Sequence, residues 1–244
     1  MEELLFEETF DKLQDSWIID DSFQPKEIKC NEKYLKYLVP LFLNEDISSH
    51  NGNGVIVGNY LITAAHVAQS KDKKNNYSKL YYVYEGNLKE VGDEQVIHDG
   101  RGYSDTDKIH DDLIIYKLDV SYNSFRFYDE QLTDVKRFCS KVFDYDESKN
   151  KIISTQVETI YNRPNSKWNN CFDVRLGYDK YICGNSGCAL FVQDVLYGIF
   201  IKIKGKKYTS IQEFIEIENF IILDAKYIKE CIDKYELNIN KEIL

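Results

Sequence analysis

The chain contains little of the residues that mark flexible connections between domains. Only 3 of its 244 residues are Pro and 12 are Gly, and no internal repeat or low-complexity tract is visible. Linkers between independent modules are usually rich in Pro, Gly and Ser. The composition therefore argues against a string of separate modules, and the length suits one large domain or two small ones that share a core.

Long apolar runs are missing as well. The run at residues 220–223 is far shorter than the roughly 20 residues that a membrane-spanning helix needs. Glu2, Glu3, Glu7 and Glu8 occupy the first positions, and no basic start precedes an apolar stretch, which is unlike a secretory signal peptide. We therefore expect a cytoplasmic protein with no membrane partner, and non-classical secretion is the alternative.

Positive charge is scarce relative to negative charge. The 41 Asp and Glu outnumber the 31 Lys and Arg, which gives a formal net charge of −10. A surface this acidic repels phosphate backbones, so nucleic acid is not expected as a partner. The aromatic residues are mainly Tyr (19) and Phe (13), which favour β-strands.

Metal and disulfide chemistry has little support. No cysteine pair has the close spacing of a zinc or redox site, and no histidines have metal-ligand spacing, so we expect no metal and no cofactor. In a reducing compartment the cysteines are expected to be thiols, and their even number leaves a disulfide framework as the alternative. The residues concerned are Cys30, Cys139, Cys171, Cys183, Cys188, Cys231, His50, His66, His98 and His110.

Short runs rich in Val, Ile, Tyr and Phe recur from Pro40 onward, and turn-forming residues bound them. Such runs predict strands, and their spacing is typical of barrels or sandwiches. The run Asn51-Gly52-Asn53-Gly54 predicts a turn. The predicted strands are 40–44, 54–58, 60–64, 79–85, 94–98, 112–118, 136–144, 151–161, 171–176, 188–193, 195–203 and 219–223.

The two ends of the chain have helical spacing. Apolar residues between Leu4 and Leu13 predict a short amphipathic helix, and residues 32–38 predict a second one. At the other end, apolar residues recur every three or four positions over 224–236, which predicts a closing amphipathic helix. Residues 121–134 are polar and form the expected connection in the middle of the chain.

Three short segments carry the candidate chemistry. In Leu61-Ile62-Thr63-Ala64-Ala65-His66-Val67, an apolar strand ends in two small residues, which let the backbone turn tightly before His66. In Gly184-Asn185-Ser186-Gly187, the N–H groups of Gly184 and Ser186 can point at one spot, as an oxyanion hole requires. A single His beside a strand is usually structural, and a bare Gly-x-Ser-Gly also occurs in turns.

The third segment supplies a carboxylate between the other two. Asp112 directly precedes an apolar run, so its side chain is expected to be partly buried and able to hold one imidazole nitrogen. Its neighbour Asp111 is the competing candidate, with a solvated loop carboxylate as its simplest reading.

In this order, Thr-Ala-Ala-His, Asp-Leu-Ile and Gly-Asn-Ser-Gly resemble the three motifs of trypsin-like (chymotrypsin-fold) serine peptidases. Asn185 stands where digestive members carry Asp, as in bacterial members with Gly-Asn-Ser-Gly. The resemblance implies an all-β dominated fold of two antiparallel six-stranded β-barrels. The implied organisation is an N-terminal extension (1–39), a first barrel (40–120), a connection (121–134), a second barrel (135–223) and a C-terminal helix and tail (224–244).

The resemblance also implies a function. Ser186 would be the nucleophile of a serine endopeptidase, His66 its base and Asp112 the group that orients His66. The expected partners are a protein or peptide substrate and an activating or inhibitory protein. A catalytically silent binding module of the same fold, or an esterase with the same triad, is the alternative.

Two departures from the digestive pattern carry expectations. Asn185 cannot supply the charge that pairs with a newly cut N-terminus, so we expect that no N-terminal cleavage is needed. Cys183 and Cys188 flank the serine motif, and we expect them to fill space as small apolar residues. The alternative is a reactive thiol or redox switch.

The resemblance implies a specificity pocket less clearly. Lys180 and Lys202, together with Lys204, suggest a preference for an acidic residue before the cleaved bond. Alternatively, residues 202–207 are a solvated hairpin tip, or Asp179 points inward and a basic preference follows. The candidate pocket residues are Lys180, Phe200, Ile201 and Lys202.

Overall fold

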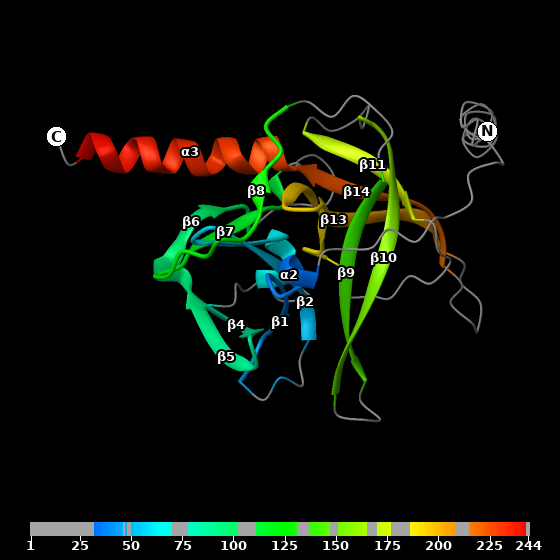
Figure 1. Cartoon of the computed structure of the whole chain (residues 1–244), viewed down its shortest axis with the longest axis horizontal. Coiled ribbons are helices and arrows are strands. Elements are labelled where there is room, and N and C mark those ends of the chain that lie inside the picture. Colours follow the sequence, from blue (N-terminus) through cyan, green and yellow to red (C-terminus); the bar gives the residue numbers. More distant parts are fainter. Residues whose placement is uncertain are drawn as a thin grey trace.

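The described residues fold mainly into two β-sheets with a long helix at their C-terminal end (Figure 1). In Figure 1 the first sheet lies on the left, the long strands of the second lie on the right, and helix α3 (Ala225–Glu242) runs along the top. The fold is dominated by β-structure, as the sequence predicts. The computed structural model describes residues 32–45, 47, 50–69, 78–101, 111–130, 137–146, 151–164, 170–176, 186–207 and 215–242.

The first sheet has the strand order β5-β4-β1-β2-β3-β7-β6, and every pairing in it is antiparallel. Its two outer strands are consecutive in the chain, because only the 3-10 helix η2 (Asp93–Gln95) separates β5 from β6. The sheet therefore curls back on itself. Its strands are β1 (Leu38–Phe42), β2 (His50–Val57), β3 (Tyr60–Thr63), β4 (Lys79–Tyr84), β5 (Asn87–Gly92), β6 (Val96–Asp99) and β7 (Ile114–Lys117).

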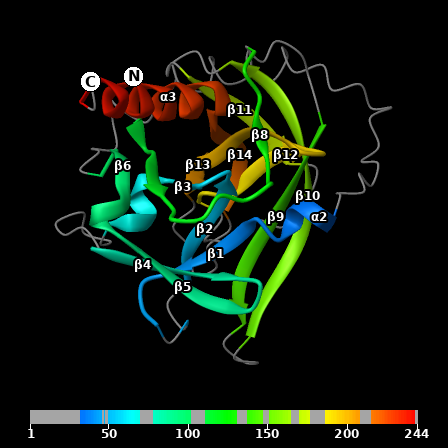
Figure 2. The same cartoon turned by 60° about the vertical axis from the view of Figure 1, so that its left-hand side comes forward.

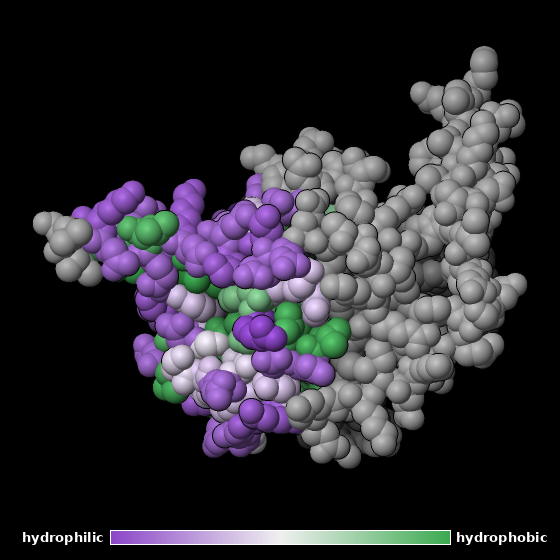
Figure 3. Space-filling model, turned by 45° about the horizontal axis from the view of Figure 1, so that its top comes forward, coloured by the Kyte–Doolittle hydropathy of each residue, from purple (hydrophilic) through white to green (hydrophobic). Residues whose placement is uncertain are grey.

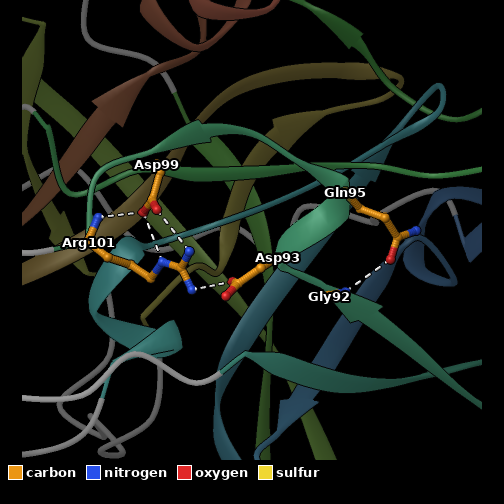
Figure 4. Close-up of polar contacts among 5 residues, drawn as sticks. All are labelled: Gly92, Asp93, Gln95, Asp99 and Arg101. Carbon is orange, nitrogen blue, oxygen red and sulfur yellow. Dashed lines mark hydrogen bonds and ion pairs between the residues drawn. The ribbon is translucent and has the colours of Figure 1, made fainter.

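Arg101 holds the bend between β5 and β6 (Figure 4). Its side chain is 5% exposed, and its guanidinium bonds to Asp99 through Nε (2.9 Å) and Nη2 (2.8 Å) and to Asp93 through Nη1 (2.7 Å). On the other side of η2, the Gly92 N–H donates to Gln95 Oε1 at 3.0 Å. A bidentate guanidinium pair fixes direction as well as distance, so the bend has a defined geometry.

The second sheet closes into a barrel. Its order is β12-β9-β10-β11-β14-β13-β8, and β12 also pairs with β13, which completes an antiparallel ring of six strands. The seventh strand, β8, adds to β13 in parallel. The strands are β8 (Arg126–Phe127), β9 (Arg137–Asp146), β10 (Lys151–Pro164), β11 (Cys171–Leu176), β12 (Ala189–Val192), β13 (Val195–Lys207) and β14 (Ile215–Asp224).

One cluster of buried apolar side chains runs through both sheets. Leu61 and Ile62 of the first sheet and Phe191 of the second are fully buried members. Phe125, in the connection between the sheets, packs against Phe191 with ring centroids 5.1 Å apart. Figure 2 shows β1 and β2 beside β9, where the two sheets meet.

Several predicted elements need correction. The predicted helix over 32–38 is shorter, because α2 (Glu32–Leu35) ends before β1 begins at Leu38. The Asn-Gly run at 51–54 lies inside β2 and is no turn. Strands β5 and β8 were not predicted, because four of the six β5 residues are exposed and β8 has only two residues. The expected helix between Leu4 and Leu13 lies outside the described residues.

The C-terminal helix packs on both sheets and extends to Glu242, beyond the predicted end at residue 236. Ile228 and Ile232 of this helix are buried. Tyr60 of β3 donates a hydrogen bond to Glu236 Oε1 at 2.5 Å. Asp224 caps the helix, because its Oδ1 accepts the Lys226 N–H at 3.1 Å.

The described surface is mainly hydrophilic on the face in Figure 3. Among the residues whose side chains the structure describes, the large apolar ones that are exposed are Leu88, Val120 and Leu237. In that same part of the chain, no helix combines the length and apolar character needed to cross a bilayer.

The helix cap makes stability depend on pH. Burial raises the pKa of Asp224 from 3.8 to about 6, although the Lys226 N–H partly offsets this. The folded state thus binds the proton more tightly than the unfolded state, and stability falls as pH rises from about 4 to about 6. Asn keeps the capping acceptor without ionising. We expect Asp224→Asn to raise the free energy of unfolding by about 3 kcal/mol at about pH 7.5, and by little near pH 4.

Urea denaturation from about pH 4 to pH 8 measures this difference. The matched control is Asp233→Asn, an exposed carboxylate of the same helix that pairs with Lys229. It should change stability by under about 0.5 kcal/mol at every pH. A stabilisation by Asp224→Asn that is equal at both ends of the pH range would contradict the burial explanation.

Candidate active site

Strand pairing brings two of the predicted residues to the same edge of the first sheet. Thr63, the last residue of β3, pairs with Ile114, the first residue of β7. His66 follows β3 in the 3-10 helix η1 (Ala65–Ala68), and Asp112 comes just before β7. Because β3 and β7 are antiparallel neighbours, both side chains leave the sheet at one edge.

Asp112 holds His66 at two points. Its side chain is 3% exposed; Oδ1 accepts the main-chain N–H of His66 at 2.9 Å, and Oδ2 lies 2.7 Å from Nδ1. A carboxylate accepts hydrogen bonds, so the neutral ring places its proton on Nδ1 and leaves Nε2 as an acceptor. The His66 ring is thereby fixed in orientation and tautomer.

Ser186 reaches this ring from the second barrel. Its Oγ lies 2.6 Å from His66 Nε2, although 120 positions separate the two residues in the sequence. The His66 side chain is 35% exposed and Ser186 is partly exposed, whereas Asp112 is buried. The series therefore runs from a buried carboxylate to a hydroxyl that a ligand can reach.

A tight turn positions Asp112. The Leu113 N–H donates to Asp111 O at 2.7 Å, and the Gly100 N–H donates to Leu113 O at 2.9 Å. A Cβ on Gly100 would lie 1.7 Å from Asp111 O, so only glycine fits there. Asp111, the competing carboxylate, accepts a hydrogen bond from Tyr227 of α3 at 3.4 Å.

Five of the other residues that the sequence analysis names at or near the site lie outside the described residues. They are Gly184, Lys180, Asp179, Asn185 and Cys183.

Phe200 and Ile201 are buried in β13, with exposures of 5% and 2%. Lys202 lies in the same strand, where it pairs with Ile221 of β14. Since β13 continues to Lys207, residues 202–207 are strand and not a hairpin tip.

Cys188 is buried beside the candidate nucleophile. It is 1% exposed, and burial raises the pKa of its thiol above the ordinary value. Since the thiolate is the reactive form, a thiol held neutral in this way is inert. The expectation that Cys188 fills space is in keeping with this burial.

Sequence reasoning missed three residues that contact the site. The sequence pattern places Gly52 and Asn53 in a turn, and it marks Thr63 only as part of the histidine motif. Asn53 N–H donates to Ser186 O at 2.8 Å, and Thr63 Oγ1 donates to Asn53 O at 2.6 Å. The signal that could have found them is the pair of glycines flanking Asn53, because glycines also mark places where backbones approach closely.

Within the described residues, no group of three or more His, Cys, Asp or Glu side chains gathers as metal ligands would. A scan of protein-family models and a search of curated proteins gave no match to this sequence.

Solved structures do match. Kallikrein-related peptidase 10 superposes with a TM-score of 0.58 at 15% identity, over 86% of this chain and 100% of that one. Human heparin binding protein gives 0.56 at 14% identity, over 85% and 94% of the two chains. The scabies mite inactivated protease paralogue S-I1 gives 0.55 at 14% identity, over 87% and 99%. Identities this low speak to the fold, and the chain has the chymotrypsin-like fold of these proteins.

Proposed function

We propose that this chain is a serine endopeptidase that hydrolyses peptide bonds through an acyl-enzyme intermediate. The observation that carries the proposal is the hydrogen-bond series from buried Asp112 through His66 to the Ser186 hydroxyl. That order of carboxylate, imidazole and hydroxyl is the one that activates a serine toward a carbonyl carbon. The resemblance of the serine motif to bacterial members with Gly-Asn-Ser-Gly supports the same reading.

In the proposed reaction, Ser186 Oγ attacks the peptide carbonyl while its proton passes to His66 Nε2. Asp112 holds the ring and stabilises the imidazolium that forms. The proposed donors to the oxyanion are the N–H groups of Gly184 and Ser186. His66 then protonates the leaving amine, and a water molecule that His66 deprotonates cleaves the ester on Ser186.

The proposal includes activity without N-terminal cleavage. Asn185 lacks the charge that a new N-terminus would pair with. In the intact chain the Ser186 carbonyl and the Gly187 N–H already have partners, Asn53 and Phe200. These bonds hold the peptide group between Ser186 and Gly187, and they support the proposal.

Substrate and control belong to the proposal too. We assign the pocket to Lys180, Phe200, Ile201 and Lys202, with a preference for an acidic residue before the cleaved bond. The substrate is a protein or peptide, and a protein partner regulates access to the site. A peptide library cleaved after Lys, Arg or large apolar residues would reject the acidic preference.

The test is labelling of the full-length protein with a fluorophosphonate probe, beside Ser186→Ala and His66→Ala. The wild type should be labelled, and both variants should not, because the reaction needs the hydroxyl and its base. Hydrolysis of an amide substrate then separates a peptidase from an esterase.

A catalytically silent module is the second candidate, and the likeness to an inactivated protease paralogue favours keeping it. Folded wild-type protein that stays unlabelled before and after N-terminal trimming would favour this candidate. Labelling that appears only after trimming would instead reject activity of the intact chain.

A further inference from the structure

The peptide group that follows the candidate nucleophile is held from both sheets. Its carbonyl, on Ser186, accepts the Asn53 N–H at 2.8 Å from strand β2. Its N–H, on Gly187, donates to Phe200 O at 2.7 Å in strand β13. The orientation of this single peptide plane therefore depends on the first sheet and the second sheet at once.

Strand β2 can reach the nucleophile because β3 is shorter. The β2–β3 pairing runs from Val57↔Tyr60 to Val55↔Ile62, so the earlier residues of β2 lie beyond the ladder. Buried backbone groups left by a neighbouring strand need other partners. Asn53 is 2% exposed, and its N–H and C=O find Ser186 O and the Thr63 hydroxyl.

Thr63 supports the backbone at Gly187 together with Asn53. It is fully buried, and its Oγ1 donates to Asn53 O at 2.6 Å. A Cβ on Gly187 would lie 1.9 Å from Asn53 O and 2.4 Å from Thr63 Oγ1, and Gly187 has φ +81°. The backbone at Gly187 is therefore packed directly against the two hydrogen-bonded groups, Thr63 Oγ1 and Asn53 O.

Gly52 lets the same strand approach Val67 and Ser186 closely. A Cβ there would lie 2.6 Å from a Val67 methyl carbon and 3.0 Å from Ser186 O. Val67 is the residue after His66, and Asn51 Nδ2 donates to Val67 O at 2.7 Å. The start of β2 is therefore in contact with the segments that carry both His66 and Ser186.

We propose that Gly52, Asn53 and Thr63, which we call the Asn53 bridge, are positioning residues that set the distance between Ser186 Oγ and His66 Nε2. The proposal rests on the proposed function. The base stands on the first sheet and the nucleophile on the second, so a small shift between the sheets would break their 2.6 Å contact. The Asn53 bridge opposes such a shift. The Asn53 N–H bonds to the Ser186 carbonyl, and the same strand, β2, contacts Val67, the residue after His66.

The variant that tests this is Thr63→Val, compared with Thr63→Ser. Val has nearly the shape of Thr but cannot donate to Asn53 O, whereas Ser keeps the hydroxyl. We expect Thr63→Val to lower kcat on an amide substrate, and the rate of fluorophosphonate labelling, by about 10- to 100-fold, since misplacement by 1 Å costs up to about 100-fold. KM should stay within about twofold, and Thr63→Ser should restore most of the rate.

A second pair of variants separates positioning from simple destabilisation. Gly52→Ala pushes on Val67 and Ser186 O. In Gly54→Ala, on the same strand, the nearest atom to the new Cβ is the end of the Leu61 side chain at 2.9 Å, which is outside the Asn53, Ser186 and Val67 contacts. Both variants are compared at a temperature where each is folded by near-UV circular dichroism. Gly52→Ala should lose rate as Thr63→Val does, and Gly54→Ala should stay near the wild type.

The outcomes separate this inference from the function on which it rests. If the wild type is neither labelled nor active, the proposed function fails. If the wild type reacts and folded Thr63→Val reacts at the same rate, only the Asn53 bridge is refuted. Equal losses in Thr63→Val and Thr63→Ser, or in Gly52→Ala and Gly54→Ala, would refute it too, because the hydroxyl and the Ser186 contact would then be irrelevant.

Discussion

Replacing Asp112 with Asn should lower kcat for an amide substrate by about 10,000-fold while leaving the fold intact. The Asp112 carboxylate accepts from the main-chain N–H and from Nδ1 of His66. The amide of Asn has one acceptor and one donor. When its oxygen keeps the main-chain bond, its NH₂ faces Nδ1, so the ring proton moves to Nε2 and the base can no longer accept from Ser186.

The matched control is Asp111→Asn, the same chemical change one residue earlier. Asp111 accepts a 3.4 Å hydrogen bond from Tyr227, and an Asn oxygen can accept it as well. We therefore expect kcat to change by less than about threefold, within the range of ordinary surface substitutions. Steady-state kinetics on both variants makes the comparison. A large loss in Asp111→Asn with little loss in Asp112→Asn would exchange the roles of the two carboxylates.

The candidate site was predictable because its chemistry sits in short local patterns. His66 and Asp112 each adjoin an apolar run, and antiparallel pairing of those runs places Thr63 opposite Ile114. A reader of the sequence sees both runs but not the pairing. The resemblance to trypsin-like peptidases supplied the expectation that these runs share one barrel, and that Ser186 lies on the second barrel.

The strands were predictable where apolar residues mark the buried positions, and they were less predictable elsewhere. Strand β5 reads as polar because four of its six residues face solvent, so no apolar pattern reports it. The Asn-Gly run of β2 has the composition of a turn, yet Gly52 is there because Val67 and Ser186 leave no room for a side chain. A constraint imposed by residues far along the chain leaves no local signal of its own.

Arg101 illustrates the same limit. As one charged residue in a polar stretch, it has nothing in its neighbourhood to predict burial. In the structure, Arg101 holds the bend of the first sheet by pairing with Asp93 and Asp99. These pairs offset the free-energy cost of burying its charge, since the side chain is 5% exposed. The next residue back, Gly100, then contacts the turn that carries Asp112.

Replacing Gly100 with Ala should cost about 3 kcal/mol of folding free energy and at least about tenfold in kcat. The added Cβ would lie 1.7 Å from Asp111 O and 2.6 Å from Leu113 O, both backbone atoms that cannot rotate away. The turn around Asp112 must therefore shift as a unit, and the carboxylate shifts with it away from His66. Chemical denaturation measures the first effect, and steady-state kinetics in folded protein measures the second.

Gly92→Ala is the matched control for Gly100→Ala, because both are buried glycines that flank η2 and β6, Gly92 before them and Gly100 after them. There the three atoms nearest to the new Cβ all belong to the carboxylate end of the Glu94 side chain, which is exposed and can turn aside. The backbone at Gly92, with φ −125° and ψ 175°, suits any residue. We expect a stability change under about 1 kcal/mol and an unchanged kcat. If both variants lost the same stability and kept full turnover, the bend would be a structural element only, and the Gly100 contact would have no part in placing Asp112.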